Sequence, residues 1–415
     1  MKGLTFIVGL LLFINARGQT ISIDTTLSEQ ELVTKVLLGD KSDLIVKNVK
    51  FTGSAKSIAA FKCDLETELI DEGIMLSTGN VFDAQGPNDQ VDKGSRSSAR
   101  RDESLQAIAT SVTTDAAVLE FDLIALRDSL EFTYVFASEE YPEYVNKGVN
   151  DVFGFFIKEV GGRGLFPRNI ALLPASRIAV SIDNVNHRRN EEYFLPSDFW
   201  HIHPPEFWKA NPAMGVRAKL FQFDGFTVPL KANIRLAEGK TYHFKIAIAD
   251  VGDRIYDSAV MIKAKSLASK GKRIAQADQI IKQYVAEQLS SWNSDKLRKS
   301  KDSLSFDLQI QFNTNEAVIL KQYQAELLDL SELLQGLKNL KVLIIGHTDD
   351  QGKEEDNLTL SLDRAKSVQS FLTQAGVAID RLSVAGKGES APLKLNQTEE
   401  GRWQNRRVEF RLSYD

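Results

Sequence analysis

The fold of the C-terminal region is decided by the stretch Val342-Leu343-Ile344-Ile345-Gly346-His347-Thr348-Asp349-Asp350-Gln351-Gly352. Four consecutive large apolar residues are typical of a short buried strand, and the glycine and polar residues that follow are typical of a turn. The stretch therefore predicts a strand that ends in a Thr-Asp turn at the edge of a sheet, where loops commonly build binding sites.

The next segment predicts a helix with polar residues on one face. In the run from Asn357 to Val368, the residues Asn357, Ser361 and Arg364 are separated by four and three positions, which brings them to the same side of a helix. Asp349 can accept a hydrogen bond from an ammonium group, and Arg364 can donate to a carboxylate. Together they predict a receptor for the zwitterionic head group of an amino acid.

Each of these residues also has a purely structural interpretation. Asp349 can close an Asx-turn, and Arg364 can form a surface ion pair with Asp363 or Glu355. Asn357 can cap the helix instead of contacting a ligand.

Working outward from this stretch, the pattern predicts alternating strands and helices in a βαβαβ order, which forms one sheet with helices on one face. The expected strands are 306–312, 342–345, 382–385 and 408–412, and the expected helices are 322–337 and 358–375. The domain as a whole is expected to span 305–415.

The larger N-terminal part has a different pattern. Segments 117–123, 129–136 and 242–248 alternate in polarity with a period of two, which predicts antiparallel strands packed as a mainly-β, sandwich-like domain over 19–266. A helix is expected near 29–38. Between 267 and 304 the apolar residues take helical spacing and a charged run follows, which predicts a helical connector and linker; the helix can pack on its own domain or bind a partner.

The first residues predict export. Lys2 precedes an apolar run of about a dozen residues, and Ala16 and Gly18 supply the small residues of a cleavage site, so 1–18 is expected to be a signal peptide rather than a buried strand or helix. No other apolar run is long enough to span a bilayer.

Cys63 is the one cysteine, so no intramolecular disulfide forms. The position directly after the signal peptide lacks the cysteine that carries the lipid of a bacterial lipoprotein. A formal charge of -5 argues against nucleic acid as a partner.

The C-terminal motifs resemble those of the OmpA-like peptidoglycan-binding domain. The similarity covers about 307–412 and includes Thr-Asp-x-x-Gly, Asn-x-x-Leu-Ser-x-x-Arg-Ala-x-x-Val, Gly-Lys-Gly at 386–388 and Asn-Arg-Arg-Val-Glu at 405–409. The resemblance implies non-covalent binding of the diamino acid of the peptidoglycan stem peptide, usually diaminopimelate, in the periplasm or outer-membrane-associated envelope of a Gram-negative bacterium. It implies five site residues, which are Asp349, Asn357, Arg364, Arg406 and Asn315.

The roles that the resemblance implies differ among these residues. Asp349 would accept from the ligand's ammonium group, and Arg364 would bind its carboxylate. Asn357 would help to hold the ligand, Arg406 would add a second cation, and Asn315 would line the pocket. Gln351 stands where some members carry a small hydroxyl residue, so that contact departs from the family pattern. For Arg407 we expect a structural salt bridge.

A second resemblance covers about 28–265. Its segments are 136–144, 150–156, 180–186 and 248–260, and they are similar to the choice-of-anchor L domain of bacterial surface proteins. That family pairs a constant domain with varying C-terminal anchors, so an OmpA-like module in the anchor position fits the pattern. The resemblance supplies no biochemical activity. We expect the β-rich domain to bind or adhere to another envelope protein or a surface glycan.

Acidic residues in the β-rich domain raise two further hypotheses. Glu139, Glu140 and Asp151 are hard oxygen ligands in loops between strands, which suits a Ca²⁺ site, although such carboxylates can equally be solvated or ion-paired. Glu139 and Asp151 are also candidate acid and base of an envelope glycan hydrolase localised by the same module. The pattern favours a binding protein over this enzyme. The aromatic stretch 193–208 is either part of the core or an exposed ligand platform.

Overall fold

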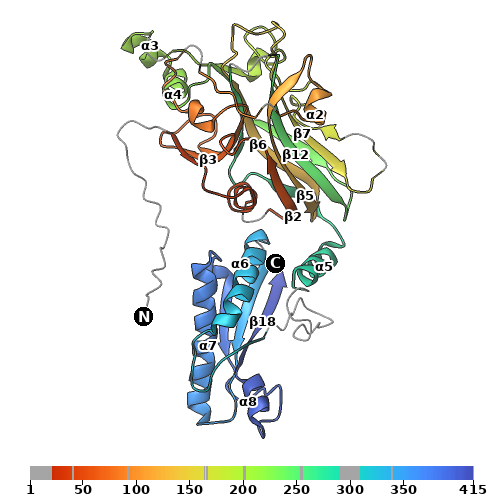
Figure 1. Ribbon diagram of the computed structural model, residues 1–415, viewed down its shortest axis with the longest axis vertical. Coiled ribbons are helices and arrows are strands. Elements are labelled where there is room, and N and C mark those ends of the chain that lie inside the picture. The colour runs from red at the N-terminus through yellow and green to blue at the C-terminus, as the bar shows by residue number, and fades with distance from the viewer. Residues whose placement is uncertain are drawn as a thin grey trace.

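The computed structural model describes residues 21–39, 42–90, 93–98, 100–162, 164, 167–199, 202–252, 256–289, 309–337 and 340–414. The expected signal peptide at 1–18 and most of the expected linker lie outside these residues. Figure 1 shows a β-rich domain at one end of the molecule and a smaller domain of strands and helices at the other. Among the described residues, no helix has both the length and the apolar character needed to cross a bilayer.

The N-terminal domain contains two β-sheets. The larger sheet has the order β1-β3-β4-β13-β6-β10-β9, and β11 and β14 also pair with β6. Its strands are β1 Ile21–Asp24, β3 Ile58–Cys63, β4 Glu72–Ser77, β6 Arg127–Ser138, β9 Phe194–Pro196, β10 Gly225–Thr227, β11 Leu230–Arg235, β13 Ser258–Lys263 and β14 Ala268–Arg273. The second sheet has the order β2-β5-β12-β7-β8, with β2 Leu44–Thr52, β5 Thr113–Ala125, β7 Val152–Glu159, β8 Arg168–Asn169 and β12 Thr241–Val251. The prediction of a mainly-β domain is confirmed.

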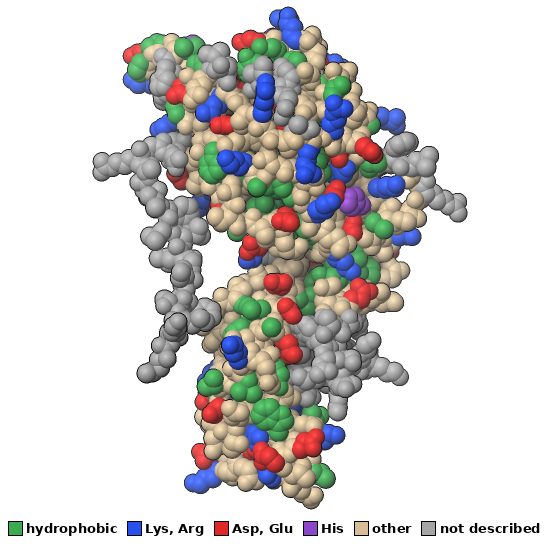
Figure 2. Space-filling view, viewed as in Figure 1, with side chains coloured by type: hydrophobic (Ala, Val, Ile, Leu, Met, Phe, Trp, Pro, Cys, Tyr) green, Lys and Arg blue, Asp and Glu red, His purple; other side chains and the backbone are tan. Residues whose placement is uncertain are grey.

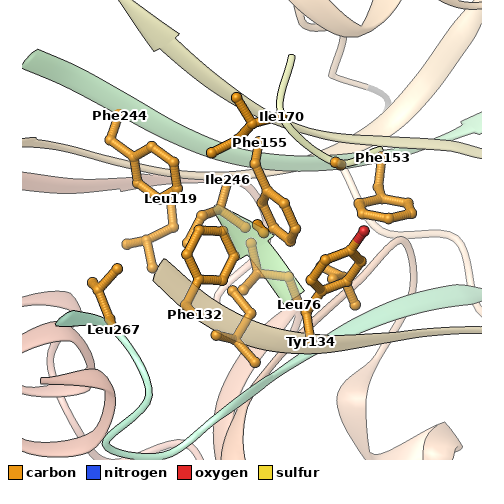
Figure 3. Close-up of a cluster of buried hydrophobic side chains, with 14 of the residues drawn as sticks. Leu76, Leu119, Phe132, Tyr134, Phe153, Phe155, Ile170, Phe244, Ile246 and Leu267 are labelled. Atoms are coloured by element: carbon orange, nitrogen blue, oxygen red, sulfur yellow. The ribbon is translucent and has the colours of Figure 1, made fainter. Parts of the chain in front are cut away.

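Aromatic side chains from both sheets meet in one core (Figure 3). The Phe132 ring of β6 lies 4.8 Å from that of Phe155 on β7 and 5.6 Å from that of Phe244 on β12, measured between centroids. Edge-to-face contacts at these distances are favourable for aromatic pairs. The alternation along β6 places Phe132 and Tyr134 in this core and Val135 on the opposite face, which is buried as well.

Short helices surround the sheets. They are α1 Glu29–Glu31, η1 Leu32–Leu37, η2 Val81–Ala84, α2 Glu103–Gln106, η3 Glu191–Tyr193, α3 Pro205–Ala210 and α4 Pro212–Leu220. The helix expected near 29–38 is confirmed, and it begins with a capping box in which Ser28 and Glu31 bond to each other's backbone N–H groups. Most of it, over Leu32–Leu37, has the wider turn of a π-helix.

The connector begins with a strand and continues as a helix. Strand β14 pairs with β6 in the segment where the pattern predicts a helical connector, so the β-rich fold extends to Arg273. Helix α5 follows at Ala277–Leu289. Its buried residues Ile281 and Val285 belong to the same apolar cluster as Ile45 of β2, and Lys47 of β2 forms a 3.1 Å ion pair with Glu287. The helix therefore packs on β2 of the β-rich domain, and its apolar cluster continues into the core of the C-terminal domain.

The C-terminal domain has a four-stranded sheet in the order β15-β18-β16-β17. Strands β16 and β17 are parallel, and β18 is antiparallel to β15 and β16. Its elements are β15 Gln309–Gln311, η5 Lys321–Tyr323, α6 Gln324–Gly336, β16 Leu340–Gly346, α7 Glu354–Gln374, η6 Ile379–Arg381, β17 Leu382–Gly386, α8 Glu399–Asn405 and β18 Arg407–Tyr414. Helix α8, between β17 and β18, was not predicted, so the expected βαβαβ order lacks one helix.

Two glycines allow α7 to lie directly on the sheet. A Cβ atom on Gly346, the last residue of β16, would come within 1.8 Å of the carbonyl oxygen of Ser361, and one on Gly386, the last residue of β17, within 2.6 Å of its Oγ. The Ser361 hydroxyl accepts a hydrogen bond from the backbone N–H of Gly388 at 2.9 Å. The start of α7 is thereby held against the ends of both parallel strands, where the Thr-Asp turn also lies.

The surface visible in Figure 2 carries acidic and basic side chains interspersed over both domains. A cleft of about 760 Å³ lies between the domains, and residues from both line it, including Glu31 and Lys47 on one side and Asp329 and Glu332 on the other. This cleft does not include the Thr-Asp turn.

Candidate functional site

Asp349 lies just beyond β16 and is 4% exposed. Its Oδ2 accepts a 2.7 Å hydrogen bond from Nη1 of Arg406, and its Oδ1 accepts one from the backbone N–H of Gln351 at 3.3 Å. The second bond is that of an Asx-turn, so this interpretation is confirmed. The carboxylate therefore closes the turn and at the same time pairs with a buried cation.

Asn357 lies inside the first turn of α7. The capping position belongs to Lys353, so the alternative in which Asn357 caps the helix is wrong. Its Nδ2 donates to the carbonyl oxygen of Asp349 at 3.3 Å and to Oε2 of Glu389 at 2.6 Å. Asn357 thus ties the Thr-Asp turn to the segment after β17.

Arg364 is completely buried. Its Nε, Nη1 and Nη2 donate to the carbonyl oxygens of Glu316, His347 and Asn313 at 2.8, 2.8 and 2.9 Å. This position does not fit a surface ion pair with Asp363 or Glu355. Burial lowers the pKa of Arg364 to about 10, which nearby Asp349 counteracts, so the guanidinium stays charged at neutral pH.

Arg406 directly follows α8 and joins two carboxylates. Besides its bond to Asp349, it donates from Nη2 to Oε1 of Glu399 at 2.7 Å and from Nε to the carbonyl oxygen of Phe312 at 3.3 Å. Its guanidinium carbon lies 5.6 Å from the ring centroid of Trp403. Burial acts to lower the pKa of Arg406, but its hydrogen bonds to the carboxylates of Asp349 and Glu399 outweigh burial and raise it.

Asn315 lies in the loop after β15 and is exposed, with a left-handed backbone φ of 57°. Two of the carbonyl groups that hold Arg364 belong to this loop, at Asn313 and Glu316. The structure therefore places the loop against the cluster, and Asn315 is one of its exposed residues.

Four of the five residues implied by the family pattern thus form one buried polar cluster, Asp349, Asn357, Arg364 and Arg406, and Asn315 lies in the loop that binds Arg364. The cluster contains one carboxylate and two guanidinium groups, an arrangement that suits a ligand with both charges. The sequence-based reasoning missed Glu389, Glu399 and Trp403. A signal for two of them was available, since Thr398 followed by two glutamates is typical of a helix start, and Thr398 does cap α8.

A second charged group lies beside this cluster. Nε2 of buried His347 is 3.3 Å from Oε2 of Glu409, and Nη2 of Arg407 is 3.5 Å from the same oxygen. The contact with His347 is the largest of the effects that hold the pKa of Glu409 at about 2. The expected salt bridge of Arg407 is therefore present.

In the β-rich domain, the three residues of the expected Ca²⁺ site are all buried: Glu139 is 3% exposed, Glu140 0% and Asp151 1%. The backbone N–H of Val251 donates to Oδ1 of Asp151 at 2.9 Å. Among the described residues, no group of three His, Cys, Asp or Glu side chains has an arrangement that could hold a metal ion. The Ca²⁺ site stays a prediction.

Glu139 has an uncommon environment. Neither of its carboxylate oxygens has a hydrogen-bond partner, and burial followed by the charges of Asp224 and Asp257 raises its pKa to about 10. The proposed acid and base of a hydrolase, Glu139 and Asp151, are therefore both shielded from solvent, and a glycan cannot contact either carboxyl group in this conformation.

The aromatic stretch 193–208 divides into two parts. Phe194 packs on Tyr141 of the core, with ring centroids 4.8 Å apart. On and just before α3, the rings of His203 and Phe207 stack and Trp208 meets both edge to face, and neighbouring Ile202 is 62% exposed. The core interpretation holds for the first part, and α3 projects from the domain in Figure 1.

Comparison with known proteins agrees with this two-part construction. Residues 311–406 match the OmpA family, which places the polar cluster inside an OmpA family domain. Residues 20–268, more than half of the chain, match the Choice-of-anchor L domain. The chain belongs to the choice-of-anchor L family and carries a C-terminal OmpA family domain.

Two relatives each match about a quarter of the chain. Outer membrane protein Omp38 of Acinetobacter baumannii is 40% identical over 108 residues, which cover 26% of this chain and 30% of the relative. Peptidoglycan-binding protein ArfA of Mycobacterium tuberculosis is 37% identical over 101 residues, or 24% of this chain and 31% of the relative. The chain thus spans about a third of the length of these relatives.

Among solved structures, the peptidoglycan-associated lipoprotein from Burkholderia pseudomallei is 30% identical, with a TM-score of 0.25, and the match covers 25% of this chain and 89% of that one. The cell wall anchor of the T6SS from Pseudomonas aeruginosa is 26% identical, with a TM-score of 0.27, and the match covers 31% of this chain and 95% of that one.

Proposed function

We propose that this chain is an exported envelope protein that is held non-covalently on peptidoglycan by its C-terminal domain and displays its β-rich domain for binding or adhesion. The observation that carries the proposal is the buried cluster of Asp349, Asn357, Arg364 and Arg406 at the end of β16, inside the segment that matches the OmpA family. Relatives of this segment include a protein named for peptidoglycan binding and several outer membrane proteins. These names support a location in the periplasm or at the outer membrane of a Gram-negative bacterium.

The ligand in this proposal is the diamino acid of the stem peptide, whose free end carries an ammonium and a carboxylate group. Asp349 is the acceptor for the ammonium group, and the two guanidinium groups of Arg364 and Arg406 provide the positive charge for the carboxylate. Because Arg406 occupies Oδ2 of Asp349 in the absence of ligand, the ligand would replace one internal ion pair by two pairs with itself. Such an exchange leaves none of the charges that take part in it unpaired.

Sedimentation of the full chain with purified sacculi tests the anchor. The Asp349→Asn variant keeps the shape of the side chain and its amide can still bond within the turn, but it removes the charge that an ammonium group requires. We expect it to lose sacculus binding by about tenfold or more, the usual size for loss of a charge-assisted bond.

A matched control lies next in the chain. Asp350 is exposed and accepts a bond only from its neighbour Gln351, at 2.9 Å, among the contacts of the described residues. The Asp350→Asn variant should therefore bind sacculi like the parent protein. If Asp349→Asn binds as well as Asp350→Asn, the site lies elsewhere and the proposal fails.

A further inference from the structure

Trp403 is the aromatic residue at the outer edge of the polar cluster. Residues 403 and 406 are three positions apart at the end of α8, so the indole ring and the guanidinium group lie on one side of the helix, and their separation of 5.6 Å is that of a cation–π contact. The second aromatic ring on the cluster, Phe312, lies 5.3 Å from the guanidinium carbon of Arg364 and is completely buried. Trp403 is instead partly exposed. The ring of Phe312 thus contacts the polar cluster inside the domain, and the ring of Trp403 borders it at the surface.

The indole N–H group of Trp403 is available to a ligand. Among the described residues, none accepts a hydrogen bond from its indole N–H group. A tryptophan side chain combines a large apolar surface with one donor, and its N–H usually finds a partner when the ring becomes buried. Helix α8 lies at the end of the molecule that faces away from the β-rich domain (Figure 1), so a long polymer can approach it without meeting that domain.

The distance between the Trp403 ring and Asp349 limits which part of a ligand the ring can contact. The guanidinium group of Arg406 contacts both, because it bonds to Asp349 at 2.7 Å and its carbon lies 5.6 Å from the centroid of the Trp403 ring. A peptide residue extends about 3.3–3.6 Å along the chain, so a group on Trp403 would lie within about three residues of a diamino acid held at Asp349. The glycan strand is farther away along the stem peptide.

We propose that Trp403 binds the part of the stem peptide next to the diamino acid, with its ring packed on aliphatic groups of the neighbouring residue and its N–H group donating to a peptide carbonyl. This inference rests on the proposed function, and it extends the site from a single head group to a short peptide. Trp403 then makes the protein prefer a diamino acid within a stem peptide over the free amino acid.

Calorimetry on the full chain with two ligands tests this inference. The ligands are free meso-diaminopimelate and the murein tripeptide that ends in meso-diaminopimelate. We expect the parent protein to bind the tripeptide about tenfold more tightly than the free amino acid, the size of one well-packed aromatic contact. The Trp403→Ala variant should lose this preference and keep its affinity for free diaminopimelate. Trp403→Phe, which keeps a ring but lacks the donor, should show an intermediate preference.

Leu395 provides the control for a general loss of apolar surface, because it is 76% exposed and its carbonyl oxygen lies beside Gly401 of α8. Leu395→Ala should retain the tripeptide preference. The inference is overturned if the parent protein binds both ligands equally, or if Trp403→Ala weakens both alike, which would mean that the ring only supports Arg406. If the parent protein binds neither ligand, the proposed function itself fails.

Discussion

Burial changes the role that Arg364 can have. The pattern on α7 and the family resemblance predict a side chain that binds a ligand carboxylate. The structure gives the same side chain three backbone acceptors, two in the loop after β15 and one directly after β16. A guanidinium group has five N–H donors, so two remain for a ligand. Arg364 therefore holds the loop before α6 against the Thr-Asp turn and also contributes a fixed positive charge to the site. Its removal would affect folding and binding together, which is why Asp349→Asn is the more informative variant.

The buried carboxyl group of Glu139 makes the stability of the β-rich domain depend on pH. Its pKa is raised from 4.5 to about 10 in the folded protein, so the folded state holds this proton more tightly than the unfolded state does. Stability therefore falls as the pH rises from 4.5 towards 10, by roughly 1.4 kcal/mol per pH unit at most for one group. Asp257, with its pKa raised to about 8 by burial, acts in the same direction.

Urea unfolding at several pH values across this window checks the effect. The Glu139→Gln variant cannot ionise, so its stability should fall less steeply with pH than that of the parent protein. The exposed Glu143→Gln variant should follow the parent curve. Parallel curves for Glu139→Gln and the parent protein would contradict the prediction. If the predicted Ca²⁺ site exists, added Ca²⁺ should stabilise the parent protein at high pH and leave Glu139→Gln unchanged.

At the scale of elements, the contact between α7 and the ends of β16 and β17 builds the site. The contact is close because Gly346 and Gly386 have no side chains, and it brings residues 357, 361 and 364 onto the turn at 347–349. A Cβ atom on Gly346 would meet backbone, which cannot move aside as a flexible side chain can. The helix would have to shift away from the sheet.

The Gly346→Ala variant should therefore destabilise the C-terminal domain by about 1–3 kcal/mol, the usual cost of overpacking, and weaken sacculus binding. Gly336 at the end of α6 is the matched control, because a Cβ atom there meets nothing within 4 Å. Thermal unfolding and sacculus sedimentation measure both effects. An unchanged unfolding midpoint for Gly346→Ala would mean that α7 does not need this close approach.

At the scale of the whole molecule, the chain separates a domain with its own two-sheet core from a domain with its own four-stranded sheet. If the C-terminal domain is the anchor, cutting the chain between the two should separate display from anchoring. A protease site inserted after Ser300 allows this cut in the protein already bound to sacculi. We expect the C-terminal fragment to pellet with the sacculi and the β-rich fragment to stay in the supernatant. A β-rich fragment that pellets by itself would show a second contact with the cell wall.

The amino-acid sequence determined the classes of the two domains and most of their elements, because polarity alternation, helical spacing and glycine turns are local signals. It also placed Asp349, Asn357 and Arg364 near one another, since a strand, a turn and the following helix are adjacent in the chain. It missed α8, a helix of seven residues with Gly401 inside it, and with it Glu399 and Trp403.

Only the tertiary structure decided which charges pair and which are buried. Asp349 and Arg406 are 57 positions apart and meet because β18 lies beside β16 in the sheet. The burial of Arg364 under a loop from residues 313–316, and of Glu139 without a partner, likewise depends on segments that are distant in the chain. Burial and ion pairing depend on everything that packs around a group, and a local pattern contains only its neighbours along the chain.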